Sequence, residues 1–172
     1  MGVANPPGEN YNYNGLYFKQ SELEDIVQQR SLNDVPVKAE HSGADVGTVR
    51  SAFLDADGAL RCVIDVPETS FQGTLVANLV RDGVAMDLSM GYSVDVQHSQ
   101  DVNRPRKLTA GAKKTLEVSL VRKGARNGCH IVGFENRAGS VVWKDRAPRA
   151  LNNGIFRRDF EHFFKPCNGK KK

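Results

Sequence analysis

The chain has 172 residues, 40% of them hydrophobic, which is enough for one domain with a buried core. Its three cysteines, Cys62, Cys129 and Cys167, include no closely spaced pair, so we expect no disulfide framework, no metal site and no cofactor. No apolar run is as long as a membrane span and no signal-peptide pattern is present, so we expect a protein that is neither membrane-bound nor secreted. The net charge of +4 comes from basic residues late in the chain, and without a nucleic-acid-binding motif we do not expect nucleic acid as a partner.

The first third of the chain is expected to form an arm, a short strand and a helix. Residues 1–11 are rich in Pro, Gly and Asn, which predicts a flexible N-terminal arm, and a short strand is expected at 16–18. Ser21 and Glu24 have the spacing of a capping box, and the apolar stripe that follows predicts a helix ending near Arg30.

A strand and a hairpin are predicted next. Apolar residues alternate over 35–41, so that His41 would end a strand, where a side chain can face a cleft. The segments 46–54 and 60–66 flank Asp55-Ala-Asp-Gly58, and Gly58 can adopt the positive φ that hairpin turns require.

A second helix is expected after Thr69 or Ser70, either of which can cap it, with Gly83 just beyond its end. It leads into the longest alternating segment, 84–96, and Ser89 lies on the polar side of that predicted strand.

The later elements are predicted from the same signals. Glu117 has the polar orientation of Ser89 on a further alternating strand, which follows a polar, basic loop. A loop is expected at 98–113, a strand at 115–121 and a turn at 124–128. Two further strands are expected at 129–134 and 140–143, followed by a basic tail at 146–172 that contains a helix at 156–164. The pattern predicts a β-dominated α+β domain over 12–145, a closed or partly open antiparallel β-barrel with a few surrounding helices.

Three residues on three extended segments have the types that nucleophilic catalysis needs: His41, Ser89 and Glu117. A hydroxyl attacks a carbonyl efficiently when an imidazole takes its proton, and a third group must orient that imidazole and stabilise its charged form. Alternatives remain open for two of these roles: Asp87 for the acid, Ser93 and Ser119 for the hydroxyl, and Cys129 for a thiol nucleophile.

These segments resemble those of the capsid maturation proteases, the herpesvirus assemblins and the prohead proteases of tailed phages. Assemblins have an apolar strand ending in the catalytic histidine, a Leu-Ser-Leu-Ser segment with the nucleophile, and a third catalytic residue before a Gly-Arg-Arg-Arg-Gly turn. The counterparts here are Val35-Pro-Val-Lys-Ala-Glu-His41, Leu88-Ser-Met-Gly-Tyr92 and Glu117-Val-Ser-Leu-Val-Arg-Lys-Gly-Ala-Arg-Asn-Gly128. The Ser-x-Gly-Tyr form and the acid in third place are nearer to the phage enzymes than to the assemblins, which have a second histidine there.

The resemblance implies a serine endopeptidase that works through an acyl-enzyme. It implies His41 as general base, Ser89 as nucleophile and Glu117 as the residue that orients His41, with the Ala125 N–H and Arg126 forming the oxyanion site.

It also implies the substrate and the surroundings. The substrate would be the internal scaffolding protein of a procapsid and the protease itself, with the major capsid protein and a second copy of the chain as further partners. The enzyme would act inside the procapsid in an infected cell, in the bacterial cytoplasm or the eukaryotic nucleus. The competing hypotheses are a barrel without enzymatic activity that binds capsid or scaffold, in which the three residues are incidental, and an esterase that uses the same residues.

Overall fold

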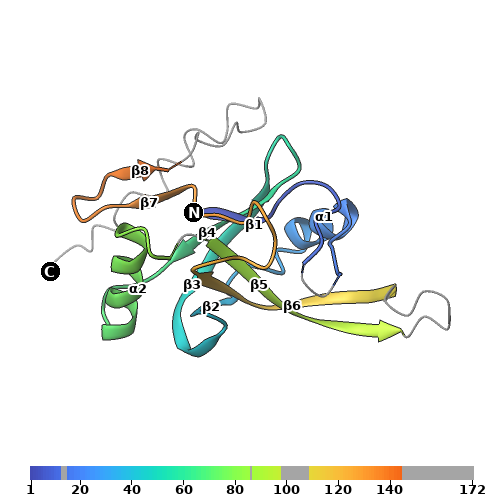
Figure 1. The fold of residues 1–172 in the computed structure, drawn as a ribbon, viewed down its shortest axis with the longest axis horizontal. Helices are drawn as coiled ribbons and strands as arrows, with labels where there is room; N and C mark the ends of the chain where they lie inside the picture. The colour runs from blue at the N-terminus through green and yellow to red at the C-terminus, as the bar shows by residue number, and fades with distance from the viewer. Residues whose placement is uncertain (13–14, 86, 98–108, 145–172) are drawn as a thin grey trace, which may run out of the picture.

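A curved sheet dominates the computed structural model of this chain, which describes residues 1–12, 15–85, 87–97 and 109–144 (Figure 1). The strands are β1 (Gly2–Asn5), β2 (Pro36–Ala39), β3 (Ser42–Leu54), β4 (Leu60–Asp65), β5 (Asp87–Gln97), β6 (Thr109–Val121), β7 (Gly133–Glu135) and β8 (Val141–Trp143), and the helices are α1 (Gln20–Gln28) and α2 (Phe71–Arg81). The expected loop 98–108 and the basic tail from 145 lie outside the described residues.

The main sheet has the strand order β1-β4-β3-β2-β6-β5, and β7 and β8 form a separate hairpin. β2 pairs with β6 in parallel, whereas the other pairs are antiparallel. The sheet curls so far that its two edge strands, β1 and β5, approach one another. Their closeness is seen at Gly2 of β1, where an added Cβ would lie 2.7 Å from Leu88 Cδ1 of β5. The prediction of a β-dominated, barrel-like fold with helices around it is confirmed, although one strand pair is parallel.

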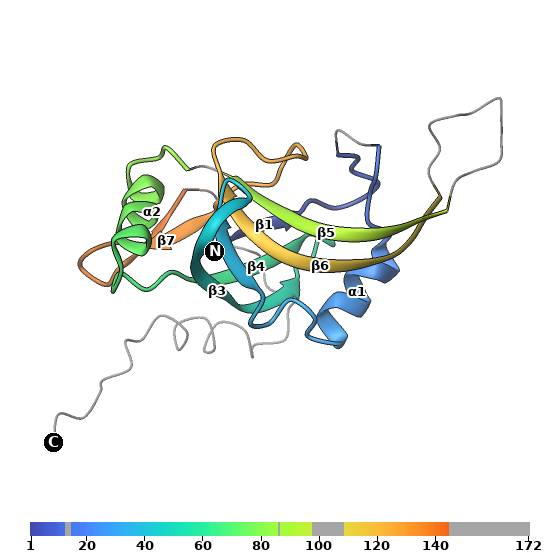
Figure 2. The same ribbon diagram turned by 90° about the horizontal axis from the view of Figure 1, so that it is seen from below.

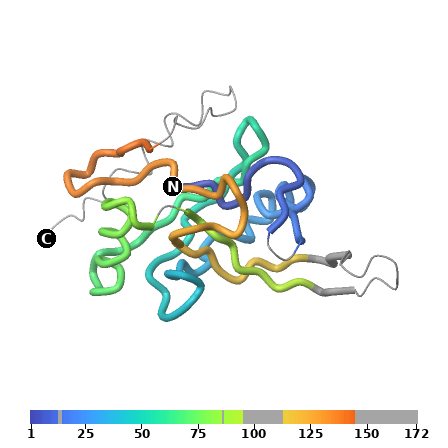
Figure 3. Tube along the Cα trace, in the orientation of Figure 1, coloured from blue at the N-terminus to red at the C-terminus, as the bar shows by residue number. Residues whose placement is uncertain are grey.

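The segment after β6 fills the space beside β1. The Val3 N–H donates to the His130 carbonyl at 2.8 Å, and the Val132 N–H donates to the Met1 carbonyl at 3.0 Å. Figure 3 shows the two parts of the chain next to one another, the N-terminus in blue and the later segment in orange. Both edges of β1 therefore have hydrogen-bond partners, which leaves little exposed strand edge.

The hairpin of β3 and β4 is confirmed. Gly58 has a φ of +84°, and the Asp55 side chain, held at 2.6 Å by Arg61 Nε, lies at the start of the turn. Both side chains are largely buried, and a buried pair is stable only when its hydrogen bonds are made. The turn and the ion pair fix the register of the two strands.

The two helices lie at opposite ends of the molecule (Figure 2). α2 begins as expected, because Ser70 Oγ accepts a hydrogen bond from the Gly73 N–H at 3.0 Å. The predicted start of α1 is wrong by two residues: its N-cap is Lys19, whose N–H donates to Glu22 Oε2 at 2.7 Å. The acidic residue that closes the first turn is therefore Glu22.

The predicted flexible arm is wrong for residues 2–5, which form the buried strand β1. Its Val and Ala side chains are buried in the core. The prediction was wrong because it was based on the Pro, Gly and Asn residues that follow them. The segment 16–18 is extended without a strand partner, although Leu16 and Phe18 are buried. The local sequence of this segment does not indicate whether a neighbouring strand is available to pair with it.

Several strand boundaries also differ from the prediction, among them the start of β3, which is Ser42 instead of 46. β5 begins at Asp87 instead of 84, because the N–H groups of Val84 and Ala85 still bond to the Leu79 carbonyl of α2. β6 begins at Thr109, inside the expected loop, and of the expected strand 129–134 only Gly133 and Phe134 belong to a strand, β7.

Candidate active site

Three adjacent strands position the predicted trio. β6 carries Glu117 and lies between β2, which leads to His41, and β5, which carries Ser89. Ser89 pairs with Ser119 and Gly91 with Glu117, and directly paired residues lie on the same face of a sheet. The expected common orientation of Ser89 and Glu117 is therefore found in the structure.

His41 does not end a strand as expected; it lies in the two-residue turn between β2 and β3. The turn consists of Glu40 and His41, with φ values of 50° and 58°. A residue with a Cβ in this left-handed region costs about 1–3 kcal/mol and persists only where the surroundings enforce it. This turn therefore needs external contacts.

β6 and Arg122, the residue directly after it, supply those contacts. The Glu40 N–H donates to the Leu120 carbonyl at 3.1 Å, and the Arg122 N–H donates to Glu40 Oε1 at 3.0 Å. The His41 N–H donates to Ser119 Oγ at 3.0 Å. We call these three hydrogen bonds the β6 clamp, because together they hold both turn residues against one strand.

The His41 ring contacts the Glu117 carboxylate. Nδ1 of His41 lies 2.6 Å from Glu117 Oε1, while Ser119 Oγ donates to the second carboxylate oxygen, Oε2, at 2.5 Å. The His41 side chain is 44% exposed, whereas the Glu117 side chain is only 11% exposed. The ring therefore has its carboxylate contact on the protein side and remains accessible from the solvent.

Ser89 is buried, with 5% of its surface exposed. No described residue hydrogen-bonds to its Oγ, and this atom is not among the buried polar atoms that lack a partner. Its Oγ thus has no bond to His41 in this structure. Catalytic hydrogen bonds are often longer in enzymes without substrate and shorten in the substrate complex.

The turn at 124–128 lies beside Ser89. Gly124 is anchored to β5, since its N–H donates to Asp87 Oδ2 at 2.8 Å and a Cβ on it would lie 2.9 Å from the Leu88 carbonyl oxygen. Asp87 is therefore engaged by the turn, whereas Glu117 is the acid beside His41. Among the described residues, no acceptor bonds to the Ala125 N–H, so this donor is available.

Arg126 is buried, with 3% of its surface exposed. Its Nε donates to the Asn10 carbonyl at 3.0 Å, and a terminal nitrogen donates to the Tyr92 hydroxyl at 3.0 Å. The guanidinium also lies 5.3 Å from the centre of the Phe18 ring. These contacts are structural in kind, and the oxyanion role of Arg126 stays a prediction.

The alternative residues have other surroundings. Ser119 is fully buried and Ser93 is exposed. Cys129 is buried, and its Sγ lies 3.3 Å from the Ala4 carbonyl oxygen. His130 Nδ1 contacts the Gly128 carbonyl at 2.9 Å. His98 and His162 lie outside the described residues.

A cavity of about 480 Å³ lies on the other face of the sheet, between α2, the end of β4 and the hairpin of β7 and β8. Leu88 and Leu120 line it, and side chains alternate along a strand, so the sheet separates this cavity from Ser89 and Ser119.

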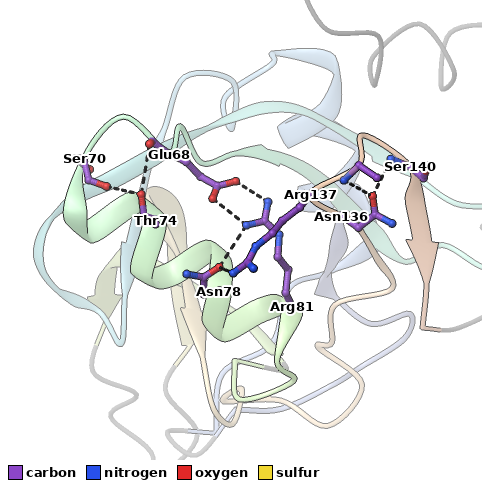
Figure 4. A network of polar contacts seen from close by, with 9 residues as sticks. Glu68, Ser70, Thr74, Asn78, Arg81, Asn136, Arg137 and Ser140 are labelled. Atoms are coloured by element: carbon purple, nitrogen blue, oxygen red, sulfur yellow. Dashed lines mark hydrogen bonds and ion pairs between the residues drawn. The ribbon is translucent and has the colours of Figure 1, made fainter.

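Some of the residues that line this cavity, Glu68, Arg81 and Arg137 among them, belong to a network of polar contacts (Figure 4). Arg81 binds both carboxylate oxygens of Glu68, at 2.5 and 2.8 Å, and Arg137 donates to Asn78 Oδ1 at 2.9 Å. The Arg81 hydrogen bonds hold the pKa of Glu68 below its usual value. The network ties the β7–β8 hairpin to α2.

The described residues offer neither a metal site nor a membrane-spanning helix. No group of three or more His, Cys, Asp or Glu side chains there could hold a metal ion. None of the helices described is long and apolar enough to cross a membrane.

Comparison with known proteins gives one likeness in structure. No protein-family model matches the sequence, and no curated protein matches it. Among solved structures, the chain is similar to KSHV protease, crystallised in complex with a hexapeptide phosphonate inhibitor, with a TM-score of 0.44 and 19% sequence identity. The similarity covers 76% of this chain and 64% of that protease, so the chain spans less than two thirds of its length. At this TM-score the likeness alone assigns neither a fold nor a function.

Proposed function

We propose that the protein is a serine endopeptidase with Ser89 as nucleophile, His41 as general base and Glu117 as the residue that orients His41. The observation that carries the proposal is the 2.6 Å contact between His41 Nδ1 and Glu117 Oε1, next to the strand that presents Ser89. A carboxylate on Nδ1 leaves Nε2 as the nitrogen that can accept a proton.

The proposed reaction begins when Ser89 Oγ attacks a peptide carbonyl carbon and His41 takes the hydroxyl proton. The Ala125 N–H, anchored beside Ser89 through Gly124 and Asp87, stabilises the oxyanion that forms. His41 then protonates the leaving amine, which leaves an acyl group on Ser89. Water, deprotonated by His41, hydrolyses this ester and restores the enzyme.

The resemblance to capsid maturation proteases supports the identity of the substrate. We propose the internal scaffolding protein of a procapsid, together with the enzyme's own chain, as substrates, and the procapsid interior as the place of action. The major capsid protein and a second copy of the chain are the proposed partners. Ser-x-Gly-Tyr and the acid at position 117 support a relation to the phage prohead branch.

A fluorophosphonate probe tests the enzyme class without knowledge of the cleavage site. The probe should label the wild-type protein with a stoichiometry near one and attach to the peptide that contains Ser89. Ser89→Ala should abolish labelling, whereas Ser93→Ala, which changes an exposed serine of the same strand, should leave it intact. Absence of labelling from a folded wild-type protein would favour the binding module without enzymatic activity.

The same assay distinguishes the two acids. Glu117→Gln keeps the size of the side chain but removes the charge, and we expect a fall in labelling rate of about 10³–10⁴-fold, as for the acid of other triads. Asp87→Asn still offers an oxygen to the Gly124 N–H, so the fall should stay below about tenfold. The reverse order of the two effects would assign the role to Asp87.

A further inference from the structure

We propose that Ser119 is a positioning residue of this active site, whose hydroxyl fixes both the Glu117 carboxylate and the backbone of His41. The inference rests on the proposed function. Ser119 Oγ donates to Glu117 Oε2 at 2.5 Å and accepts from the His41 N–H at 3.0 Å. One atom thus binds the Glu117 carboxylate and the backbone of the residue that carries the imidazole.

The direction of these bonds follows from the chemistry of a hydroxyl. It has one hydrogen to donate and lone pairs to accept with. A backbone N–H can only donate, so Ser119 Oγ must accept from His41, and its own hydrogen is left for the Glu117 carboxylate. Ser119 is fully buried, with 0% of its surface exposed, so water does not compete for these positions.

The second carboxylate bond restricts rotation at the end of the Glu117 side chain. The terminal torsion of a glutamate is broad, so a single contact leaves the carboxylate plane free to turn. Here Oε1 meets His41 Nδ1 and Oε2 meets Ser119 Oγ, so both oxygens are held. The carboxylate is thereby kept from turning away from His41 Nδ1.

Ser119 also acts on the position of His41 itself. The turn at residues 40 and 41 has two left-handed residues with side chains, and its contacts with β6 hold it in that form. Ser119 provides the acceptor for the His41 residue within the β6 clamp. The same contacts argue against Ser119 as the nucleophile, since its hydrogen is directed at a buried carboxylate, whereas no described residue hydrogen-bonds to Ser89 Oγ.

Nuclear magnetic resonance tests the positioning without any need for activity. An imidazole N–H that donates to a carboxylate at short range gives a proton resonance at unusually low field, which His41→Gln should remove from the wild-type spectrum. In Ser119→Ala this resonance should disappear or move upfield, while the dispersion of the backbone amide signals stays that of a folded protein. Ser93→Ala should leave the resonance unchanged.

Fluorophosphonate labelling tests the effect on reactivity. Ser119→Ala should label about 10–100 times more slowly than wild type, the loss typical when groups that orient metal-binding histidines are removed. In a Glu117→Gln background the same change should cost less than in wild type, because the part of its effect that passes through the Glu117 carboxylate is already lost.

An unchanged resonance or an unchanged labelling rate in folded Ser119→Ala would overturn the inference, and so would the absence of a low-field resonance from the wild type. A wild type that the probe does not label would overturn the proposed function, while the resonance would still decide the role of Ser119.

Discussion

At the scale of single residues, the space for the Glu117 carboxylate depends on the absence of a side chain at position 91. A Cβ at Gly91 would lie 2.0 Å from Glu117 Oε1 and 2.8 Å from its Cδ. Real Cβ atoms do not approach other heavy atoms this closely, so any larger residue must displace the carboxylate. The glycine of the Ser-x-Gly-Tyr segment is thus explained by the acid opposite to it.

Gly91→Ala should therefore move Glu117 away from His41 and slow fluorophosphonate labelling by about 100-fold or more, the cost of a displacement near 1 Å in an active site. It should also lower the free energy of unfolding by about 1–3 kcal/mol through overpacking, as measured by denaturant titration. In a Glu117→Ala background the clash is absent, and the same change should leave stability nearly unaltered. A loss of stability that is equal in both backgrounds would contradict this explanation.

Two cysteines are predicted to be unreactive. Burial raises the pKa of the thiols of Cys62 and Cys129 to about 12, so both keep their protons in the folded protein at pH 8. Iodoacetamide at this pH should modify neither peptide, as read by mass spectrometry, until denaturant is added. Modification of Cys129 in the folded protein would restore it as a candidate nucleophile.

The same shift has a consequence for stability. The unfolded chain loses these thiol protons near its ordinary pKa of about 8.5, before the folded chain does. The free energy of unfolding should therefore fall as the pH rises from about 9 toward 12.

At the scale of elements, the turn that carries His41 combines an unfavourable backbone with strong attachment to β6. Glu40→Gly would relieve the left-handed strain at one residue but remove the carboxylate that accepts from the Arg122 N–H. These effects oppose one another, so the free energy of unfolding should change by less than about 1 kcal/mol. Labelling should nevertheless fall by about tenfold, because His41 is less firmly held.

Arg122→Ala is the matched control for this turn. It keeps the backbone N–H that binds Glu40 and removes only an exposed guanidinium at 3.5 Å, so labelling should stay within about twofold of wild type. If Glu40→Gly labels at the wild-type rate, the attachment of the turn to β6 is irrelevant to reactivity.

The elements that could be predicted from the sequence are those with local signals. The Asp-Gly turn of the β3–β4 hairpin, the Ser70 cap and the alternation of β5 each depend on a few neighbouring residues. The turn at Glu40 and His41 has neither Gly nor Asn, so only its contacts with β6, about eighty residues later, allow it to form. The roles of Ser119 and Gly91 follow from strand register, which the sequence alone does not specify.

At the scale of the whole molecule, Arg126 joins parts of the chain that are distant in sequence. Its guanidinium donates to the carbonyls of Asn10 and Leu16 and to the Tyr92 hydroxyl, and it lies over the Phe18 and Tyr92 rings. The N-terminal segment, β5 and the turn beside Ser89 thus share one buried cation. Removal of the guanidinium costs each acceptor one hydrogen bond, although the Leu16 carbonyl and the Tyr92 hydroxyl keep their bonds from Asn12.

Arg126→Met should lower the free energy of unfolding by about 3 kcal/mol and the melting temperature by about 6–12 °C. Arg137→Met, which changes an exposed arginine with a bond to Asn78, should lower the melting temperature far less. Labelling measured well below the melting temperature then separates the two roles of Arg126. Since its donors are engaged by Asn10, Leu16 and Tyr92, we expect labelling of the folded variant within about tenfold of wild type. A fall of about 10²–10³-fold in the folded variant would instead place the guanidinium at the oxyanion.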